Sequence, residues 1–537
     1  AHCRINELGV GRAAPLLVDD RLYIINNSPS LLVINAKTGK YIGKKQKLGT
    51  VGWGSPVYAD GKIYCVERNG RCYIFEPSED GVKKLHQLRL NSEEINTSPI
   101  VSHGRVYIAT NHNMYCIGLA DAKVEADPRP ETGEETPVSE DEKPALAQVV
   151  PVEVLVKPGQ TQSYEVRLFN ANGQFLGTAA DLKTKVEFSV AGGGEIDAEG
   201  KYTAPAKSGG MAVTVTAKVG DLEGEGRIRV VRSLPWNYDF SDGQIPVTWV
   251  GMRYRHVPID FDLFTKLRKA NPLAADMYVY VTTSFVNGNL SKAKYQDVGP
   301  VQRWTEMLRF CELNGKITSL EETKAAFDAA LKLLVDEKVL SKYAFGTEGG
   351  LFIAVEKGER EVDGDGVMCK ITTIPKGTRS QGWMGHIDFS DYTTQADVYG
   401  TGVPSAAGNP TTKMPDIGVV AQRYRFELMG ASQELKLYSW VAHEIEFKKV
   451  PFAWEPDVWY TMKLQASTKK EFGKDVAVLR GKVWKRDEKE PSAWSIEWTD
   501  VPANTHGSPG LVGNAKDAEI FFDNVKVTPN SAATTAG

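Results

Sequence analysis

Three residues in the second half of the chain combine side chains that can bind a polar, ring-shaped ligand. Trp383, His386 and Asp388 lie within one six-residue stretch. An indole ring can stack on the apolar face of a sugar, while an imidazole and a carboxylate can hydrogen-bond its hydroxyl groups. Asp391 and Tyr392 follow closely and could line the same groove. His386 beside Asp388 could equally form a structural hydrogen bond, which is the alternative that we favour.

Catalytic and metal-binding patterns are much weaker. A retaining glycosidase needs two carboxylates about 5 Å apart, and the usual Glu-x-Asp-x-x-Glu run does not occur in this sequence. Glu497 and Asp500 flank Trp498, but alternation on a strand near a turn favours a solvated edge position for Glu497. Asp363 and Asp365 lack the terminal Glu of a calcium loop, which favours a hairpin turn. We therefore predict no catalytic residue and no metal site.

The same half of the chain is rich in tryptophan. Six more of these rings could stack on sugars, although in a β-sandwich most of them should belong to the core. They are Trp440, Trp454, Trp459, Trp484, Trp494 and Trp498. The predicted ligand-binding residues are therefore limited to Trp383, His386 and Asp388.

The six cysteines are too few and too scattered for a disulfide scaffold. None forms a CxxC pair with histidines at ligand spacing, so a structural zinc site is not expected. Cys65 and Cys72 flank a turn, and a two-residue loop there would place Cys65 opposite Ile74, diagonal to Cys72 on the same face. We therefore expect no bridge between them.

Composition and charge restrict the partners. The chain has 537 residues, 42% apolar and 25% charged, which is typical of a folded protein with about three or four domains. Lys and Arg number 64 against 68 Asp and Glu, a formal net charge of -4, so no basic field predicts nucleic acid as a partner. No apolar run is long enough for a membrane-spanning helix. Because the sequence begins without Met or a signal-peptide apolar region, we expect it to be N-terminally incomplete or processed.

One block recurs three times near the start of the chain, with periods of 41 and 43 residues. Each copy is an apolar run, a tight turn and a second apolar run, followed by a further strand, which predicts successive hairpins. A period just above 40 residues with four strands per unit is typical of propeller blades. Equivalent positions are predicted for the prolines and tyrosines of the copies: Pro15, Pro56 and Pro99, and Tyr23, Tyr64 and Tyr107.

The Ser-Pro-x-Val-x-x-Gly-x-Val-Tyr pattern of these copies resembles the pyrroloquinoline-quinone (PQQ)-type repeat of bacterial propellers. That resemblance covers residues 1–120 and implies either a quinone-dependent alcohol dehydrogenase or a non-enzymatic outer-membrane assembly propeller. The dehydrogenases carry adjacent cysteines, a tryptophan under the quinone and calcium ligands, whereas this chain has no adjacent cysteine pair and only Trp53 in the repeats, where blade packing is favoured. We therefore expect no quinone cofactor. Three blades do not close a ring, so further blades are expected upstream or in another chain.

Two further segments follow. Residues 121–148 hold nine acidic residues, three basic residues and four prolines, which predicts a disordered acidic linker. Residues 149–233 alternate apolar and polar positions from Val150 to Val156 and predict an all-β sandwich. The Gly200-x-Tyr202-x-Ala204-Pro sequence resembles the signature of bacterial Ig-like domains, which usually act as spacers.

Residues 234–530 open with an aromatic strand from Trp236 and close with Phe522-Asp-Asn-Val525. This order resembles the concanavalin-A-like jelly roll of sugar-binding modules, in which the two end strands pair at the sheet edge. Residues 258–346 interrupt it with helical patterns, the clearest a capping box at Ser319 before apolar positions at Phe327 and Leu331. A second helix is predicted over 302–313, strand patterning resumes at 350–355, and residues 531–537 form a disordered tail.

These observations predict a mainly β, multidomain protein: partial β-propeller blades, an Ig-like β-sandwich and a concanavalin-A-like jelly roll with an α-helical insertion. The predicted function is a non-catalytic binding or scaffold protein of the bacterial periplasm, cell envelope or exterior, with a polysaccharide or an envelope protein as partner. The alternative is a quinone-dependent dehydrogenase or a glycoside hydrolase whose active site lies partly outside this chain. A weaker hypothesis makes the helical insertion a protein-docking element.

Overall fold

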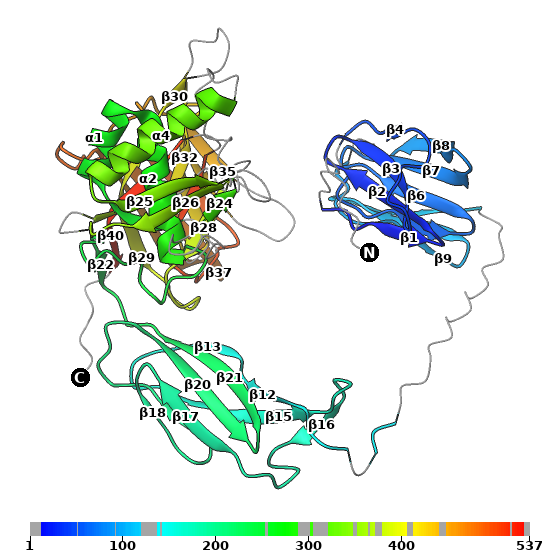
Figure 1. The fold of residues 1–537 in the computed structure, drawn as a ribbon, viewed down its shortest axis with the longest axis horizontal. Coiled ribbons are helices and arrows are strands. Elements are labelled where there is room, and N and C mark those ends of the chain that lie inside the picture. The colour runs from blue at the N-terminus through cyan, green and yellow to red at the C-terminus, as the bar shows by residue number, and fades with distance from the viewer. Residues whose placement is uncertain are drawn as a thin grey trace. The chain divides into compact units, whose positions relative to one another are not determined.

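The structure is a computed structural model that divides the chain into two compact units, Ala1–Thr136 and Pro137–Gly537 (Figure 1). It describes residues 12–50, 52–91, 93–119, 137–139, 142–252, 256–287, 301–303, 320–346, 352–362, 366–370, 379–404, 412–439, 447–515 and 518–530. Antiparallel sheets dominate both units, so the prediction of a mainly β, multidomain chain is confirmed. Among the helices in these ranges, none combines the length and the apolar character that crossing a membrane requires.

The first unit consists of three consecutive antiparallel sheets, in the order β1-β2-β3-β4, β5-β6-β7-β8 and β11-β10-β9. Their bounds are β1 Leu16–Val18, β2 Arg21–Asn26, β3 Ser30–Asn35, β4 Gln46–Lys47, β5 Val57–Ala59, β6 Lys62–Val66, β7 Arg71–Ser78, β8 Gly81–Arg89, β9 Ile100–Ser102, β10 Arg105–Ala109 and β11 Met114–Ile117. A cluster of buried apolar side chains from the first two sheets, including Tyr23, Val33, Ile63 and Phe75, packs between them. Sequence-adjacent strands pair throughout, as the repeat predicts.

The predicted equivalence of the three repeats is confirmed by the strand register. Each proline immediately precedes the first strand of its sheet, where its missing N–H leaves no ladder bond unmade. The residue after each proline pairs with the tyrosine of its own copy: Leu16 with Tyr23, Val57 with Tyr64 and Ile100 with Tyr107. Successive repeats are also joined in the same way, because Ser55 Oγ accepts a bond from the Ala14 amide and Ser98 Oγ one from the Ser55 amide, each at 2.9 Å.

The predicted position of Cys65, on the same face as Cys72, is wrong. Val66 pairs with Cys72, so Cys65 lies opposite Tyr73 rather than Ile74. The connection between β6 and β7 is longer than two residues, which shifts the register by one position and turns the two cysteines to opposite faces. Both thiols are free and buried, in different apolar clusters.

The second unit begins with a small sandwich built from three sheets, β12-β15-β16, β13-β21-β20-β17 and β14-β19-β18. Its strands are β12 Leu146–Val150, β13 Glu153–Val156, β14 Thr161–Ser163, β15 Glu165–Phe169, β16 Phe175–Thr178, β17 Glu187–Ala191, β18 Glu195–Ile196, β19 Lys201–Thr203, β20 Met211–Val219 and β21 Leu222–Val230. The alternating run from Val150 to Val156 is not one strand, because Pro151 divides it between two sheets. Tyr202 packs in the core and donates to the Gly193 carbonyl at 3.1 Å.

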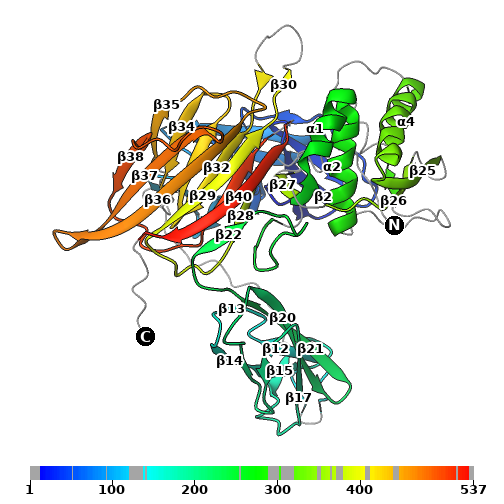
Figure 2. The same ribbon diagram turned by 90° about the vertical axis from the view of Figure 1, so that its left-hand side faces the viewer.

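A larger sandwich occupies the rest of the second unit. An eight-stranded sheet in the order β23-β27-β40-β29-β36-β37-β38, with β22 paired to β40, faces a six-stranded sheet in the order β28-β39-β32-β33-β34-β35. Figure 2 shows the strands from β29 to β40 of this sandwich, coloured from yellow to red, beside the green helices. The strands of the larger sandwich are β22 Trp236–Tyr238, β23 His256–Asp260, β27 Gly366–Lys370, β28 Arg379–Trp383, β29 Tyr392–Gly400, β32 Asp416–Ala421, β33 Tyr424–Met429, β34 Glu434–Tyr438, β35 Phe447–Pro451, β36 Trp459–Glu471, β37 Lys474–Lys485, β38 Ile496–Asp500, β39 Gly510–Asn514 and β40 Ile520–Pro529. Strands β30 Val403–Pro404 and β31 Thr412–Lys413 pair with each other and form a short two-stranded ribbon.

The two end strands of this sandwich pair with each other, as predicted. Trp236 pairs with Val527 and Tyr238 with Val525. Strand β40 pairs with β29 along one side. On its other side, its first half pairs with β27 and its second half with β22, which has no other partner among the described strands. The core between the two sheets is apolar and includes Trp249, Tyr424 and Phe426.

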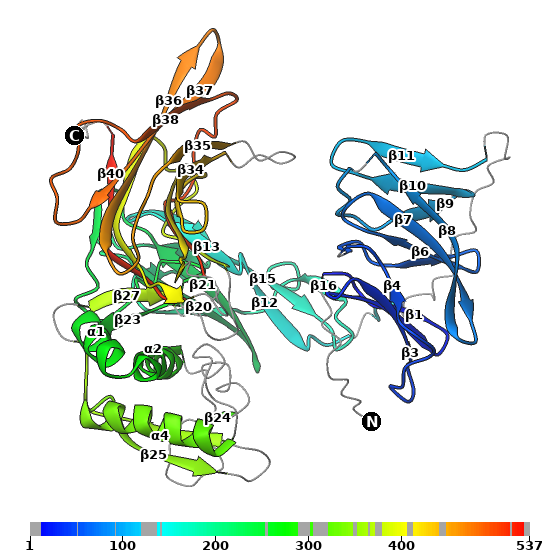
Figure 3. The ribbon, with the colours of Figure 1, turned by 90° about the horizontal axis from the view of Figure 1, so that it is seen from above.

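The predicted helical insertion is a mixed α/β cap. Helices α1 Phe261–Ala270, α2 Pro272–Asn287 and α4 Leu320–Asp336 are joined by a small sheet of β24 Val301–Arg303, β25 Leu340–Gly346 and β26 Phe352–Lys357. The strand predicted at 350–355 therefore belongs to the cap and not to the sandwich. Figure 3 shows α1 and α2 beside β23 and β27, with α4 and β25 beyond them. The apolar face predicted for α4 is confirmed, since Phe327, Leu331 and Leu334 are buried.

Several predictions concern segments outside the described residues. They are the helix over 304–313, the capping residue Ser319, the turn at 363–365, the tryptophan at 440, most of the acidic linker and the tail at 531–537. Residues 302 and 303, assigned to the same helix, lie instead on strand β24.

Candidate functional site

The outer face of the six-stranded sheet carries a row of side chains that strand register fixes. Alternation turns every second residue of each strand away from the core. Pairing then aligns Trp383 of β28, Gly510 of β39, Val420 of β32, Arg425 of β33 and Tyr438 of β34 in one line across the sheet. Phe447 of β35 pairs with Tyr438 and completes the row, so aromatic residues stand at both ends, with the guanidinium group of Arg425 between them.

A groove of about 600 Å³ lies over the part of this row that runs from Trp383 to Arg425. We call it the Trp383 groove, and its lining residues are Leu155, Val250, Gln381, Trp383, Gly385, Ile387, Val420, Arg423, Arg425, His506, Gly507 and Ser508. Trp383 is 37% exposed, and its backbone exchanges two hydrogen bonds with Val250, of 2.8 and 2.9 Å. Gly510 leaves room beside the indole, because a Cβ at this position would lie 2.3 Å from the Gly382 carbonyl oxygen and 3.4 Å from the Trp383 ring.

The charged residues that line the groove are basic. Arg423 is exposed in the turn between β32 and β33, and its side chain crosses Gly507. Arg425 donates to the Gln381 side chain and lies 3.7 Å from the Glu427 carboxylate. His506 is exposed, and its Nδ1 lies 3.0 Å from the Thr505 hydroxyl. The groove can therefore offer an aromatic face and several hydrogen-bond donors to one ligand.

The structure places the three predicted binding residues in two different environments. Trp383 lines the groove, whereas His386 and Asp388 are not among its lining residues. Asp388 forms an ion pair of 2.8 Å with Lys157 of the small sandwich instead of bonding to His386. That ammonium group is the main cause that lowers the pKa of Asp388. Burial lowers the pKa of His386, so its ring is neutral near pH 7. The binding role of all three stays a prediction.

The other polar candidates have structural roles. Asp391 accepts a bond from the Thr468 amide at 2.6 Å, and buried Tyr392 donates to the Gly507 carbonyl at 2.7 Å. Glu497 is exposed on the edge strand β38, as predicted. Its carboxylate accepts a bond from Arg480. Asp500 is buried and accepts bonds from the hydroxyls of Tyr424 and Ser439.

Most of the other tryptophans belong to the core, as expected. Trp454 and Trp484 are buried, and Trp498 packs against the inter-sheet core. Trp459 packs against the apolar cluster that joins the cap to the sandwich. Trp494 is half-buried, with the Lys482 ammonium 4.5 Å from its ring centre. None of these five rings lines the Trp383 groove.

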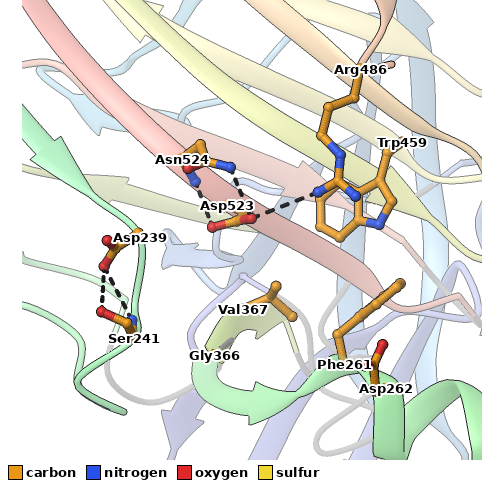
Figure 4. A pocket seen from close by; sticks show the side chains of 10 residues that line it. All are labelled: Asp239, Ser241, Phe261, Asp262, Gly366, Val367, Trp459, Arg486, Asp523 and Asn524. Atoms are coloured by element: carbon orange, nitrogen blue, oxygen red, sulfur yellow. Dashed lines mark hydrogen bonds and ion pairs between the residues drawn. The ribbon is translucent and has the colours of Figure 1, made fainter. Parts of the chain in front are cut away.

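A second cavity of about 450 Å³ lies where the cap meets the eight-stranded sheet. We call it the cap pocket, and Figure 4 shows the residues that line it: Asp239, Ser241, Phe261, Asp262, Gly366, Val367, Trp459, Arg486, Asp523 and Asn524. The Arg486 guanidinium stacks 4.3 Å from the centre of the Trp459 ring. Three carboxylates and one guanidinium make this pocket acidic, in contrast to the groove. No cluster of three or more potential metal-binding side chains occurs in the described ranges of the chain.

Asp523 has an unusual titration in the cap pocket. Burial raises its pKa to about 6, and the neighbouring carboxylate of Asp397 acts in the same direction, while Asn524 and Arg486 oppose them. The Asn524 amide links the two carboxylates, donating to Asp397 at 2.9 Å and to Asp523 at 3.0 Å. Asp523 therefore carries a proton in the folded protein at pH values where it would be ionised in the unfolded chain.

This titration predicts the pH dependence of an Asp523→Asn variant. Because the folded pKa is raised, the native state binds more protons than the unfolded state between about pH 4 and 6, and the stability contributed by Asp523 falls as the pH rises through that window. The uncharged side-chain amide of the Asp523→Asn variant does not titrate, so the variant does not lose this stability as the pH rises. We expect the variant to be more stable than the parent by about 1 to 2 kcal/mol at pH 7.5, with no gain at pH 4. Urea unfolding of both proteins at the two pH values measures the difference, and an equal gain at both would contradict it.

Sequence reasoning missed the two arginines of the groove. Arg425 alternates with buried Tyr424 and Phe426, which marks it as facing away from the core. Its sheet position depends on pairing with strands far away in sequence, and no local pattern reports that pairing. Arg423 lies in a tight turn with a positive φ of 68°, and the sequence around it does not predict this backbone conformation.

Comparisons with known proteins identify no relative in sequence: no protein family matches the chain, and no curated protein does. Among solved structures, the crystal structure of BamB from Moraxella catarrhalis shares 15% identity over 38% of this chain and 57% of that one, with a TM-score of 0.18. A structure of S. cerevisiae dbp5 bound to nup159, gle1, IP6 and ADP shares 9% identity over 41% of this chain and 51% of that one, with a TM-score of 0.15. The chain thus spans only about half the length of each structure. At these scores, neither likeness identifies a fold or a function.

Proposed function

We propose that this chain is a non-catalytic, multidomain binding protein of the bacterial cell envelope, and that its larger sandwich binds a saccharide in the Trp383 groove. The observation that carries this proposal is the exposed indole of Trp383 in a groove that also holds Gln381, Arg425 and His506. Sugars present an apolar ring face together with hydroxyl groups, so they need this combination of surfaces.

The proposal includes an assignment of each part of the chain. We assign residues 1–120 to PQQ-type propeller blades, supported by the three equivalent Pro and Tyr positions. Residues 149–233 are assigned to an Ig-like spacer, supported by buried Tyr202. Residues 234–530 are assigned to a concanavalin-A-like jelly roll, supported by the two facing sheets and their paired ends. The blades serve as a scaffold and bind no quinone, because the sequence lacks the adjacent cysteines of the dehydrogenases.

The groove should bind short saccharides with modest affinity. It is open to solvent along the sheet, and a shallow site returns little free energy beyond the cost of association. We expect dissociation constants on the order of 0.1 to 1 mM for a small saccharide. Longer polysaccharides would bind more tightly, because they would also contact the part of the row that contains Tyr438.

Substituting the indole tests the proposed function. We expect Trp383→Ala to weaken the binding of any saccharide ligand by at least about tenfold, since the stacking surface is lost while the sheet remains. Glycan-array screening of the full chain identifies the ligand, and calorimetric titration measures the effect. Trp494→Ala is the matched control, because this indole is also partly exposed but lies outside the groove. Binding to no polysaccharide, or equal binding by parent and Trp383→Ala, would contradict the proposal.

A further inference from the structure

We infer that the ligand of the Trp383 groove is an anionic saccharide, one whose rings carry carboxylate or sulfate groups. This inference rests on the proposed function and specifies its ligand class. It depends on the charge of the groove lining, which includes two arginines and a histidine but no carboxylate.

Arg423 is the group best placed to meet an anion. It is exposed, and within the described parts of the chain no carboxylate forms an ion pair with it. A Cβ at Gly507 would lie 2.7 Å from the Arg423 Cγ, so the glycine allows the stem of this side chain to lie flat along the groove wall. A guanidinium held in this way keeps its planar set of donors for bidentate bonds to a carboxylate or sulfate.

Arg425 adds a second cation, fixed in position by its neighbours. Gln381 accepts a bond from it, and the Glu427 carboxylate lies 3.7 Å away. These contacts hold the side chain within the row that contains Trp383, three strands away. Strands are spaced about 4.8 Å apart, so the backbones of the two residues are separated by about 14 Å along the row. The bond to Gln381, which lies on the same strand as Trp383, brings the Arg425 guanidinium back across this distance toward the indole.

The cap pocket shows that this charge pattern is not a general property of the sandwich. Its lining includes three aspartates and a single arginine, although it also contains a tryptophan. The whole chain has a formal net charge of -4, so an anion finds no general attraction to the protein. An anionic saccharide would be repelled by the cap pocket and attracted by the groove, whereas a neutral one would meet no such difference.

The experiment compares three polysaccharides with the full chain: polygalacturonate, which carries carboxylates, dextran sulfate, which carries sulfates, and neutral dextran. We expect one or both anionic polymers to bind at least about tenfold more tightly than dextran, and this advantage to shrink when the ionic strength rises from about 0.05 to 0.5 M. Arg423→Gln should weaken anionic binding about five- to tenfold, and Arg425→Gln by a similar factor. Arg480→Gln is the matched control, since it removes the same charge from the opposite sheet.

The outcomes separate this inference from the proposed function. Tighter binding of dextran, or anionic binding that Arg423→Gln and Arg425→Gln leave unchanged, overturns the anionic class while Trp383→Ala still tests the saccharide site. Anionic binding lost equally in Arg480→Gln shows a non-specific charge effect and also overturns it. If polygalacturonate alone binds, the anion is a carboxylate; if dextran sulfate alone binds, it is a sulfate. If no saccharide binds, both the inference and the proposed function fail.

Discussion

Replacing Phe521 with alanine is expected to destabilise the larger sandwich by about 3 to 5 kcal/mol. Phe521 is fully buried on the cap side of strand β40, where its ring centre lies 4.7 Å from Phe264 and 5.2 Å from Phe261 of helix α1. Tyr399 of the neighbouring strand is 5.6 Å away. Removing the ring leaves a cavity between two elements whose backbones are fixed by their own hydrogen bonds, so the site cannot collapse to fill it.

The measurement is chemical unfolding followed by near-ultraviolet circular dichroism, with limited proteolysis to show which segment opens first. Because Phe521 joins the cap to the sandwich, we expect helices α1 and α2 to become sensitive to protease in the variant before the sandwich unfolds. The matched control is Phe472→Ala, at the fully exposed tip of the hairpin between β36 and β37, which should change stability by less than about 0.5 kcal/mol. Similar effects of the two substitutions would contradict the prediction.

Local patterns in the sequence predicted individual strands well. The repeats fixed three hairpins because each copy contains its own turn and its own apolar runs, and these contacts are close in sequence. The pairing of Trp236 with Val527 was predicted only through the resemblance to a known fold, since nearly 300 residues separate them. The valine alternation around Pro151 predicts one continuous strand, although the chain passes from one sheet to another at this proline.

Features that depend on register or distant pairing could not be predicted. A longer connection moved Cys65 opposite Tyr73, because one extra position reverses the faces of a strand. The cap was predicted as helical, but strands β25 and β26 pair with each other and complete its core.

The candidate site was predicted only in part, for the same reason. Trp383 lines the groove, while His386 and Asp388 follow after the strand has ended, where alternation no longer tells which way a side chain points. Arg425 reaches the groove through pairings across four strands that no local sequence pattern contains.

A pair of carboxyl groups, one from the cap and one from the sandwich, gives the second large expected effect. Asp276 of helix α2 hydrogen-bonds to Glu519, which precedes strand β40 and is only 7% exposed. Burial, followed by the charge of Glu519, raises the pKa of Asp276 well above its usual range. Burial also raises the pKa of Glu519, although bonds from Asp276 and Thr401 and the charge of Arg268 oppose the rise. Asp276 therefore keeps a proton and donates it to the Glu519 carboxylate.

We expect Asp276→Ala to destabilise the cap and the sandwich by about 3 kcal/mol at pH 7, because Glu519 loses a donor and stays buried. Asp276→Asn should behave differently, since its amide donates the same bond without holding a titrating proton. The folded pKa values of the pair are raised, so the parent's stability falls as the pH rises above the usual carboxyl range, and the asparagine variant should lose less over the same interval. Unfolding measured from pH 5 to pH 9 tests this, with exposed Asp336→Asn as the control. A parent and an Asp276→Asn variant with the same pH dependence would show that the two carboxyl groups do not share a proton.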